Sequence, residues 1–421
     1  MVSSSRFRES RVYDGFGDDS NASVWVVEEG KLKKINQYSN FNVGRLYRYI
    51  TLLLGMKPNE HEFKVMGLAP YCSEYIYRKP LEVFRKAYKF DNGEIIVDPE
   101  VKDNYFYFKE RLEGMRFDGI AAALQILTEE LNCQLIEYWQ KKTGKKKVVI
   151  SGGVALNIKS NMKIGQLDAI EDIFVVGSSG DESQCVGAIY SYLDSVGRSS
   201  EIRPIDNLYL GGAITKKDIE NVIYGIDLEK YEVMSNPTAR DIAQKISEGL
   251  ILGRAVGRME FGARALGNRS ILADPRKRET IDRINAKIKS RDFWMPFTPS
   301  ILFEEKDRFL DNPKNIQYPF MAISCDTTED GKKYLQAAIH PADKTARPQL
   351  VTPEMNKKYY DLIKAFKDIT GVGALLNTSL NLHGYPIVST AEEAFYVLDN
   401  SDLDGLILDG YLIIKVGADV C

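Results

Sequence analysis

Arginine and lysine side chains gather in one stretch of the chain, from Gly253 to Arg291. This stretch holds eleven Lys or Arg and only four Asp or Glu, a local charge of +7 in a protein of net charge −3. Glycines recur there beside Arg258, Arg264 and Arg269. Glycine lets the backbone approach a ligand closely, and arginine binds phosphate oxygens through two parallel hydrogen bonds. We therefore predict a site for a phosphorylated small molecule, in preference to a solvated basic helix face.

Polar residues spaced two apart recur on both sides of a further arginine. Lys289 and Arg291 point to the same side if their segment is extended, and Ser379 and Asn381 have the same spacing. Arg347 lies between the two pairs in the sequence. Cations combined with hydroxyl and amide groups suit a triphosphate or a carboxyl phosphate. With the basic segment, these residues predict an anion site in the second half of the chain.

Two glycine turns follow apolar runs in the first half. Gly152 and Gly153 come after the run 146–151, and Asn157 lies in the helix expected from about residue 155. Such a turn offers N–H groups to an anion, or serves only as a tight turn for packing. Asp181 follows the run 172–176 at an expected helix start, where a carboxylate caps the helix or binds a hard cation.

A third glycine turn, DGFGDD, begins at Asp14. Its backbone N–H groups and carboxylates could hold a phosphate or a metal, although acidic glycine turns are common in ordinary hairpins. Histidine is nearly absent, and His61, His340 and His383 are scattered along the chain. We therefore predict no Ser-His-Asp triad.

The helices and strands that must position these residues predict an α/β fold. The repeated order of strand, glycine turn and helix predicts a mostly parallel sheet with ligand sites at the strand ends. The expected strands are 21–27, 146–151, 172–176, 251–256, 322–325, 372–376 and 406–414. The expected helices are 44–54, 117–140, 182–193, 238–250, 356–370 and 391–398.

The composition and length of the chain indicate its class and its number of domains. A hydrophobic content of 44% and a charged content of 27% are ordinary for a globular protein, and 421 residues predict two or three domains. A polar stretch at 195–206 marks the expected boundary, which divides the chain into residues 1–200 and 201–421. The five cysteines are scattered and odd in number, and no apolar run reaches membrane length. We expect a cytoplasmic protein that does not enter membranes.

Seven strings carry a resemblance to a known family. They are KPNEHEFKVMGLAPY, SGGVALN, GDES, GRMEFGARALGNRSILADPR, NAKIKSRDFWMPFTPSIL, TARPQLV and LLNTSLNLHGYPIV. In this order, across nearly the whole chain, they resemble the nodulation-type O-carbamoyltransferases, a family that includes the tobramycin and cephalosporin carbamoylating enzymes. The resemblance implies a partial actin-like (ASKHA) carbamoyl-transfer domain over 1–200 and a YrdC-like α/β domain over 201–421.

The resemblance also implies a reaction. The YrdC-like domain uses carbamoyl phosphate and ATP to form carbamoyl adenylate, and the first domain transfers the carbamoyl group to a hydroxyl of a sugar-like small molecule. The implied cofactors are ATP with Mg²⁺ and a divalent metal in the first domain, iron being one candidate. The KxR and SxN signatures of YrdC-like domains match Lys289 with Arg291 and Ser379 with Asn381.

Roles follow residue by residue from the same resemblance. The catalytic residues implied are Lys289, Arg291 and Arg347. The cofactor-binding residues implied are Ser379, Asn381, Arg258, Arg264, Arg269, Gly152, Gly153 and Asn157. The metal ligands implied are Asp14 and Asp181.

The sequence also departs from the family pattern. Family members usually begin with a further segment that supplies an HxxxH pair of metal ligands, and this chain starts just before the DGFGDD turn. Met295, Ala263, Tyr385 and His383 stand where Arg, Pro, Glu and Arg residues, respectively, are usual in the family's motifs. Possible partners are a separate N-terminal fragment and a second copy in a homodimer. One alternative is therefore a partner-dependent or inactive truncated subunit. Another is carbamoylation of a nucleic-acid base or tRNA, against which the net negative charge and the few aromatic residues of the basic segment argue.

Overall fold

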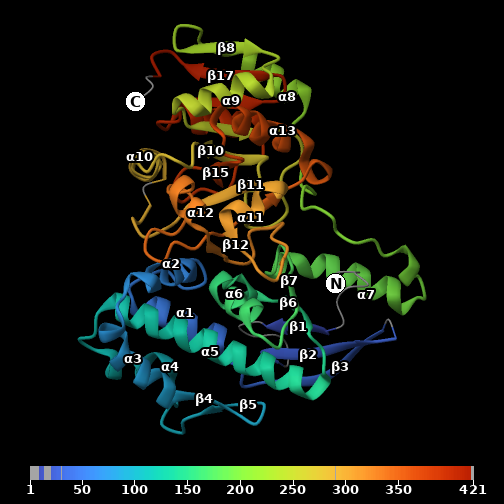
Figure 1. The fold of residues 1–421 in the computed structure, drawn as a ribbon, viewed down its shortest axis with the longest axis vertical. Coiled ribbons are helices and arrows are strands. Elements are labelled where there is room, and N and C mark those ends of the chain that lie inside the picture. Colours follow the sequence, from blue (N-terminus) through green and yellow to red (C-terminus); the bar gives the residue numbers. More distant parts are fainter. Residues whose placement is uncertain (1–8, 14–19, 30, 290, 419–421) are drawn as a thin grey trace. The chain divides into compact units, whose positions relative to one another are not determined.

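The chain folds into two compact units in a computed structural model. The structure describes residues 9–13, 20–29, 31–289 and 291–418. Unit 1 comprises residues 1–204, 313–317 and 322–324, and unit 2 comprises residues 205–312, 318–321 and 325–421. The change between units at Pro204 and Ile205 falls in the polar stretch 195–206. Both units have a mixed α/β fold (Figure 1).

Unit 1 is built on a mixed sheet. Its strands in spatial order are β3 (Lys31–Tyr38), β2 (Ala22–Glu28), β1 (Glu9–Tyr13), β6 (Lys147–Ser151) and β7 (Asp172–Val175). The pairs β1·β6 and β6·β7 are parallel, whereas β1·β2 and β2·β3 are antiparallel. The mostly parallel sheet that we expected is therefore limited to the three strands β1, β6 and β7.

Helices surround the long helix α5 in unit 1. The helices are α1 (Val43–Leu53), α2 (Glu62–Leu68), α3 (Glu74–Ala87), α4 (Asn104–Leu112), α5 (Phe117–Thr143), α6 (Ile158–Gln166) and α7 (Gln184–Ser195). The hairpin β4 (Tyr88–Asp91) and β5 (Glu94–Val97) lies beside them. Helix α5 packs against α3, α6 and α2, and its buried residues include Leu124, Leu131 and Leu135. It ends at Gly144, which has the left-handed conformation. The predicted helix at 117–140 is confirmed.

Unit 2 holds a second, largely antiparallel sheet. Its strands in spatial order are β14 (Gln349–Val351), β11 (Thr298–Leu302), β15 (Ala374–Ser379), β10 (Arg269–Ala273), β9 (Leu252–Ala255), β16 (Gly405–Leu408), β17 (Tyr411–Lys415) and β8 (Tyr231–Ser235). Only β11·β14 and β9·β16 are parallel among its described pairs. A separate pair joins β12 (Leu310–Asp311) to β13 (Asp326–Thr327).

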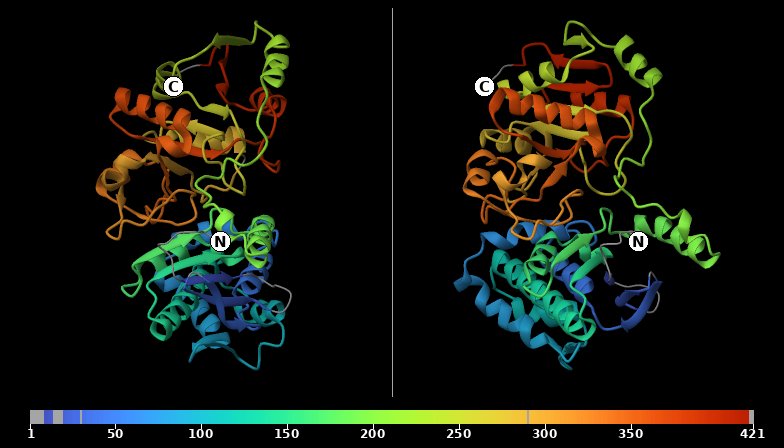
Figure 2. Two further views of the ribbon diagram at one scale, coloured as in Figure 1. Left: turned by 90° about the vertical axis from the view of Figure 1, so that its right-hand side faces the viewer. Right: turned by 45° about the vertical axis from the view of Figure 1, so that its right-hand side comes forward.

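Helices cover both faces of this sheet (Figure 2). They are α8 (Lys216–Tyr224), α9 (Ala239–Glu248), α10 (Glu279–Ile284), α11 (Lys306–Phe309), α12 (Glu329–Tyr334), α13 (Pro353–Thr370) and α14 (Ala391–Asp399). One core cluster joins Ile271 of the sheet to Val222 of α8 and Leu398 of α14. Helix α13 packs against α9 and buries Tyr359 and Phe366. The sheet is thus buried on both faces, which explains why β9, β10 and β11 are buried along their whole length.

Two expected strands differ from the structure. The stretch 322–325 forms only an isolated bridge at Cys325, and the stretch 406–414 is a hairpin of β16 and β17 rather than one strand. The chain reverses at Asp409 and Gly410, where Gly410 has a φ of 85°. Within the described residues, no helix combines the length and the apolar character needed to cross a membrane.

Candidate phosphate-binding site

Lys289, Ser379 and Asn381 lie together in unit 2. Lys289 ends a π-helical turn, Asn285–Lys289, that follows α10, and Ser379 is the last residue of β15. The Lys289 Nζ donates to the carbonyl and Oγ of Ser379 and to the carbonyl and Oδ1 of Asn381. The expectation of an extended segment at Lys289 is wrong, because the contact is made from a helical turn.

Lys289 is buried, with 2% of its surface exposed. Burial, and to a lesser extent the neighbouring Arg291, lower the pKa of Lys289 below its ordinary value. The oxygen atoms around Nζ act in the opposite sense, because acceptors favour the ammonium form. Since Ser379 and Asn381 already occupy its donors, Lys289 holds the end of β15 in place in this conformation.

Three arginines lie close to one another near this lysine. Arg264 is in the loop between β9 and β10, Arg291 follows the π-helical turn, and Arg347 precedes β14. Burial lowers the pKa of each, and Arg264 and Arg291 lower that of Arg347 further. Each of the three residues is half-buried. Loops that are far apart in the sequence thus bring four cations together, and we call Arg264, Lys289, Arg291 and Arg347 the cation cluster.

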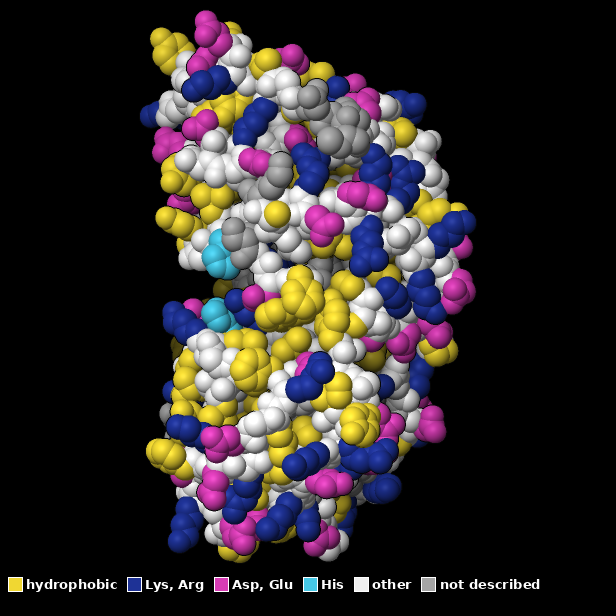
Figure 3. Space-filling model, turned by 90° about the vertical axis from the view of Figure 1, so that its left-hand side faces the viewer, with side chains coloured by type: hydrophobic (Ala, Val, Ile, Leu, Met, Phe, Trp, Pro, Cys, Tyr) yellow, Lys and Arg dark blue, Asp and Glu magenta, His cyan; other side chains and the backbone are white. Residues whose placement is uncertain are grey.

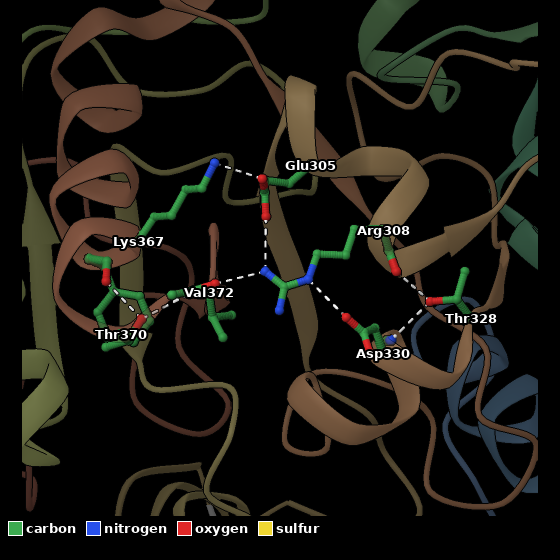
Figure 4. A network of polar contacts seen from close by, with 10 residues as sticks. Glu305, Arg308, Thr328, Asp330, Lys367, Thr370 and Val372 are labelled. Carbon is green, nitrogen blue, oxygen red and sulfur yellow. Dashed lines mark hydrogen bonds and ion pairs between the residues drawn. The ribbon is translucent and has the colours of Figure 1, made fainter.

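Among the described residues, the three arginines of the cluster lack the counter-ions that other arginines of unit 2 have. Arg308, for example, binds Glu305 at 3.3 Å and Asp330 at 2.9 Å, and Lys367 shares the Glu305 carboxylate (Figure 4). By contrast, none of the cluster's guanidinium groups makes an ion pair or a side-chain hydrogen bond with any residue in the described part of the chain.

Few negative charges among the described residues offset the positive charge of the cluster. Asp292 is the neighbouring carboxylate that raises the pKa of Arg291, and the Arg291 guanidinium lies 5.7 Å from the centre of the Phe297 ring. The Nε of Arg347 is buried without a hydrogen-bond partner among the described residues. Uncompensated, partly buried cations are costly unless an anion joins them. The arrangement therefore suits a multiply charged anion.

Two predicted arginines do not join the cluster. Arg258 is exposed and donates to the carbonyls of Tyr209 and Leu210. Arg269 is buried and donates to the carbonyls of Val256 and Asn268. Both guanidinium groups hold backbone in this conformation, a role that the glycine and arginine spacing did not indicate.

The predicted residues of unit 1 lie at the turn after β6. Gly152 has a φ of 100°, and Gly153 begins a short 3₁₀ turn, Gly153–Leu156. The Asn157 side chain exchanges two hydrogen bonds with Gln125, at 2.9 and 3.0 Å, and its Oδ1 also accepts from the N–H of Ser160. Asn157 therefore caps α6, as well as lying beside the glycine turn.

The predicted metal ligands do not form a recognisable site in the described chain. Asp14 lies outside the described residues. Asp181 is exposed and accepts a hydrogen bond from Gln184 at 3.0 Å. Among the residues that the structure describes, no group of three His, Cys, Asp or Glu side chains could hold a metal ion. The divalent metal that the resemblance implies stays a prediction, because Asp14, one of its two implied ligands, lies outside the described residues.

The positions that depart from the family pattern fall into two groups. Met295 is buried, with 8% of its surface exposed, whereas Ala263, His383 and Tyr385 are exposed. His340 is buried, and its Nδ1 accepts from the N–H of Ala342.

Two supporting residues were missed in the sequence. Arg254 lies in β9, donates to Gly267 and Asn268, and stacks 5.3 Å from the ring centre of Tyr359. Asn377 in β15 donates to the carbonyl of Ala265, the neighbour of Arg264, at 3.2 Å. A charged or amide residue inside an otherwise apolar strand was the available signal for both.

Family models match most of the chain. The model described as Carbamoyltransferase N-terminus matches residues 5–190, and the model described as Carbamoyltransferase C-terminus matches residues 243–415. The cation cluster lies within the second match.

Curated relatives agree with this assignment. An uncharacterized protein of Methanocaldococcus jannaschii is 31% identical over 95% of this chain and 69% of its own length. The nodulation protein NolO of Bradyrhizobium diazoefficiens is 33% identical over 98% of this chain and 76% of its own length. The 3'-hydroxymethylcephem-O-carbamoyltransferase of Amycolatopsis lactamdurans is 27% identical over 69% of this chain and 52% of its own length.

Solved structures share only a distant likeness. Full-length HypF, in a phosphate- and nucleotide-bound form, covers 45% of this chain at 14% identity and a TM-score of 0.29. Component A of the (R)-2-hydroxyglutaryl-CoA dehydratase of Acidaminococcus fermentans covers 47% at 14% identity and a TM-score of 0.31. Likeness at this level carries no functional argument. The two family models, and the relatives that match nearly the whole of this chain, show that it belongs to the carbamoyltransferase family of enzymes.

Proposed function

We propose that the protein is an O-carbamoyltransferase that activates a carbamoyl group at the cation cluster of unit 2. The substrates are carbamoyl phosphate and ATP, and the activated product is carbamoyl adenylate. The observation that carries the proposal is the convergence of Arg264, Arg291 and Arg347 without carboxylate partners among the described residues.

The charge of the cluster matches the chemistry. Two anionic substrates repel each other, and fixed cations offset that repulsion without reorganising during the reaction. The planar guanidinium forms two parallel hydrogen bonds with a phosphate, so three arginines can hold more than one phosphoryl group. Lys289 supports them by fixing Ser379 and Asn381 at the end of β15.

The reaction balances in three steps. Water cleaves carbamoyl phosphate to carbamate and inorganic phosphate. A carbamate oxygen then attacks the α-phosphorus of ATP, and pyrophosphate leaves. Finally, the oxygen of an acceptor hydroxyl attacks the carbamoyl carbon, AMP leaves, and the hydroxyl proton is released. Carbamoyl adenylate hydrolyses readily, so exclusion of water favours transfer to the acceptor.

Unit 1 is the proposed place of transfer. We assign the adenylate to the turn at Gly152 and Gly153 with Asn157 beside it, since N–H groups at the start of a helix attract phosphate. We also propose an actin-like fold for unit 1 and a YrdC-like fold for unit 2. The proposed acceptor is a hydroxyl of a sugar-like small molecule. The relative named as a 3'-hydroxymethylcephem-O-carbamoyltransferase supports the hydroxyl group of a small molecule as the acceptor.

The proposal predicts release of pyrophosphate that depends on Arg347. The purified chain is incubated with ATP, Mg²⁺ and carbamoyl phosphate, and pyrophosphate is measured. We expect Arg347→Ala to lower the rate at least about tenfold, because a charge-assisted hydrogen bond contributes about 1.5–3 kcal/mol.

The matched control is Arg308→Ala. It also removes a partly exposed arginine of unit 2, but one whose charge Glu305 and Asp330 balance (Figure 4). We expect its rate to stay within about twofold of the wild-type rate. A folded wild-type protein that releases no pyrophosphate, or an Arg347→Ala rate equal to that of the control, contradicts the proposal.

A further inference from the structure

The loop between β9 and β10 carries Arg264 into the cation cluster. An arginine on a loop loses affinity for its anion if the loop must be ordered when the anion binds. The side chain that fixes this loop is therefore part of the binding machinery, even without contact with the anion.

Glu260 is the carboxylate within that loop. It is 5% exposed, and its Oε1 accepts hydrogen bonds from the backbone N–H of Leu266 and of Asn268, both at 2.7 Å, and of Arg269 at 3.3 Å. The carboxylate thus ties the beginning of the loop to its end, on both sides of Gly267. Arg264 lies in the short span that these bonds close.

Glu260 acts electrostatically on buried arginines outside the cluster. It raises the pKa of Arg254 and Arg269, which burial lowers, whereas it has no part in the pKa changes of Arg264, Arg291 or Arg347. Glu260 also forms no ion pair with any residue that the structure describes. The carboxylate can therefore hold the loop without neutralising the positive charge of the site.

We infer that Glu260 is a positioning residue, which fixes Arg264 in the orientation that binds the phosphoryl group of the substrate. The inference rests on the proposed function, because it assumes that Arg264 binds phosphate. It adds a residue that makes no contact with the substrate and acts only through Arg264.

A double-mutant cycle tests this role. Inorganic pyrophosphate is titrated calorimetrically into the wild-type chain, Arg264→Ala, Glu260→Ala and the double variant. We expect each single variant to bind at least about tenfold more weakly, and the double variant to bind no more weakly than Arg264→Ala alone, because coupled residues are non-additive. Glu260→Gln, which keeps an acceptor oxygen, is expected to retain binding within about threefold.

The controls separate positioning from stability. Asp241→Ala removes another carboxylate that accepts a backbone N–H, at the start of α9, and should leave pyrophosphate binding unchanged. If Glu260→Ala does not fold, Glu260→Asp replaces it in the cycle, since it keeps the charge and shortens the reach of the carboxylate.

The outcomes distinguish the inference from the proposed function. Equal weakening by the Glu260 substitution in the wild type and in the Arg264→Ala background overturns the inference, because Glu260 then acts independently of Arg264. Wild-type affinity in Glu260→Ala, or in Glu260→Asp where that variant replaces it, overturns it as well, with the phosphate site intact. Wild-type affinity in Arg264→Ala instead contradicts the proposed site itself.

Discussion

The buried positions of the arginines in the cation cluster lower their pKa values. Burial and Arg291 lower the pKa of Arg264 to about 10, and burial with two neighbouring guanidinium groups lowers that of Arg347. A bound anion reverses both effects, because it favours the charged form. Anion binding and protonation are therefore coupled at this site.

This coupling predicts a pH dependence for phosphate binding. The cations are charged below their lowered pKa values and lose charge as the pH rises through them. We expect the affinity for the phosphate dianion, the main form of inorganic phosphate above neutral pH, to fall between about pH 9 and about pH 10.5, around the lowered pKa of Arg264. Calorimetric titration over this range measures it, and an affinity that stays constant to the upper end is the contrary result.

The hydrogen bonds of Lys289 predict that its removal lowers the stability of the fold. Lys289→Ala removes the donor to four oxygen atoms of Ser379 and Asn381, and buried acceptors without donors are costly. We expect the free energy of unfolding to fall by about 2–4 kcal/mol. Lys357→Ala, which removes an exposed partner of Asp361, should change it by less than about 0.5 kcal/mol. Urea unfolding compares them, and equal midpoints would refute the supporting role of Lys289.

At the scale of elements, the loop from β9 to β10 depends on Gly267. Its φ is 116°, and a Cβ there would lie 2.4 Å from Cδ1 of Tyr359 on α13. Gly371 has a φ of 75° but open space around the position of a Cβ. Alanine at Gly371 would cause backbone strain alone, whereas alanine at Gly267 would cause backbone strain and a steric clash.

We predict that Gly267→Ala destabilises the protein more than Gly371→Ala does. Backbone strain alone costs about 1 kcal/mol, and the overlap with the Tyr359 ring adds about 1–3 kcal/mol. Denaturant unfolding gives both free energies. If the two variants were equally stable, the close packing of this loop on α13 would be refuted.

The sequence predicted the elements with the strongest local signals. The periodic helix at 117–140 and the apolar strand at 146–151 correspond to α5 and β6. Strand β10 was missed because its residues, RSILA, stand inside a segment read for its charge. The hairpin of β16 and β17 was read as one strand because the turn signal of Asp409-Gly410 was overlooked.

The sequence predicted that the site binds an anion, but it did not predict which arginines belong to the site. The excess of Lys and Arg in one segment indicated an anion site, and the structure places Arg264, Lys289 and Arg291 together there. It cannot be told from spacing that Arg258 and Arg269 instead donate to backbone carbonyls. That outcome depends on the three-dimensional path of the loop, and on the unpaired carbonyls that it leaves.

At the scale of the whole molecule, the chain alternates between units more often than its sequence indicates. Residues 313–317 and 322–324 belong to unit 1, although they follow a long part of unit 2. There, Lys314 donates to the carbonyls of Gly165, Leu167 and Ile170 and so caps α6, and Asn161 donates to the carbonyl of Ala322. These contacts join residues about 150 positions apart, which local patterns do not predict.

The charges on the protein surface differ in their pairing from those of the cation cluster. On the face drawn in Figure 3, Lys and Arg side chains are interspersed with Asp and Glu side chains. The cation cluster differs because its guanidinium groups have no such partners among the described residues. A local excess of positive charge in a protein of net charge −3 favours a small anionic ligand over a long polyanion.

The most direct measurement is a crystal structure of the wild-type protein grown with carbamoyl phosphate or inorganic phosphate. The account predicts a phosphate group in unit 2 whose oxygens lie about 3 Å from the guanidinium nitrogens of at least two of Arg264, Arg291 and Arg347. Phosphate bound elsewhere at saturating concentration, with those three arginines left unliganded, would contradict it.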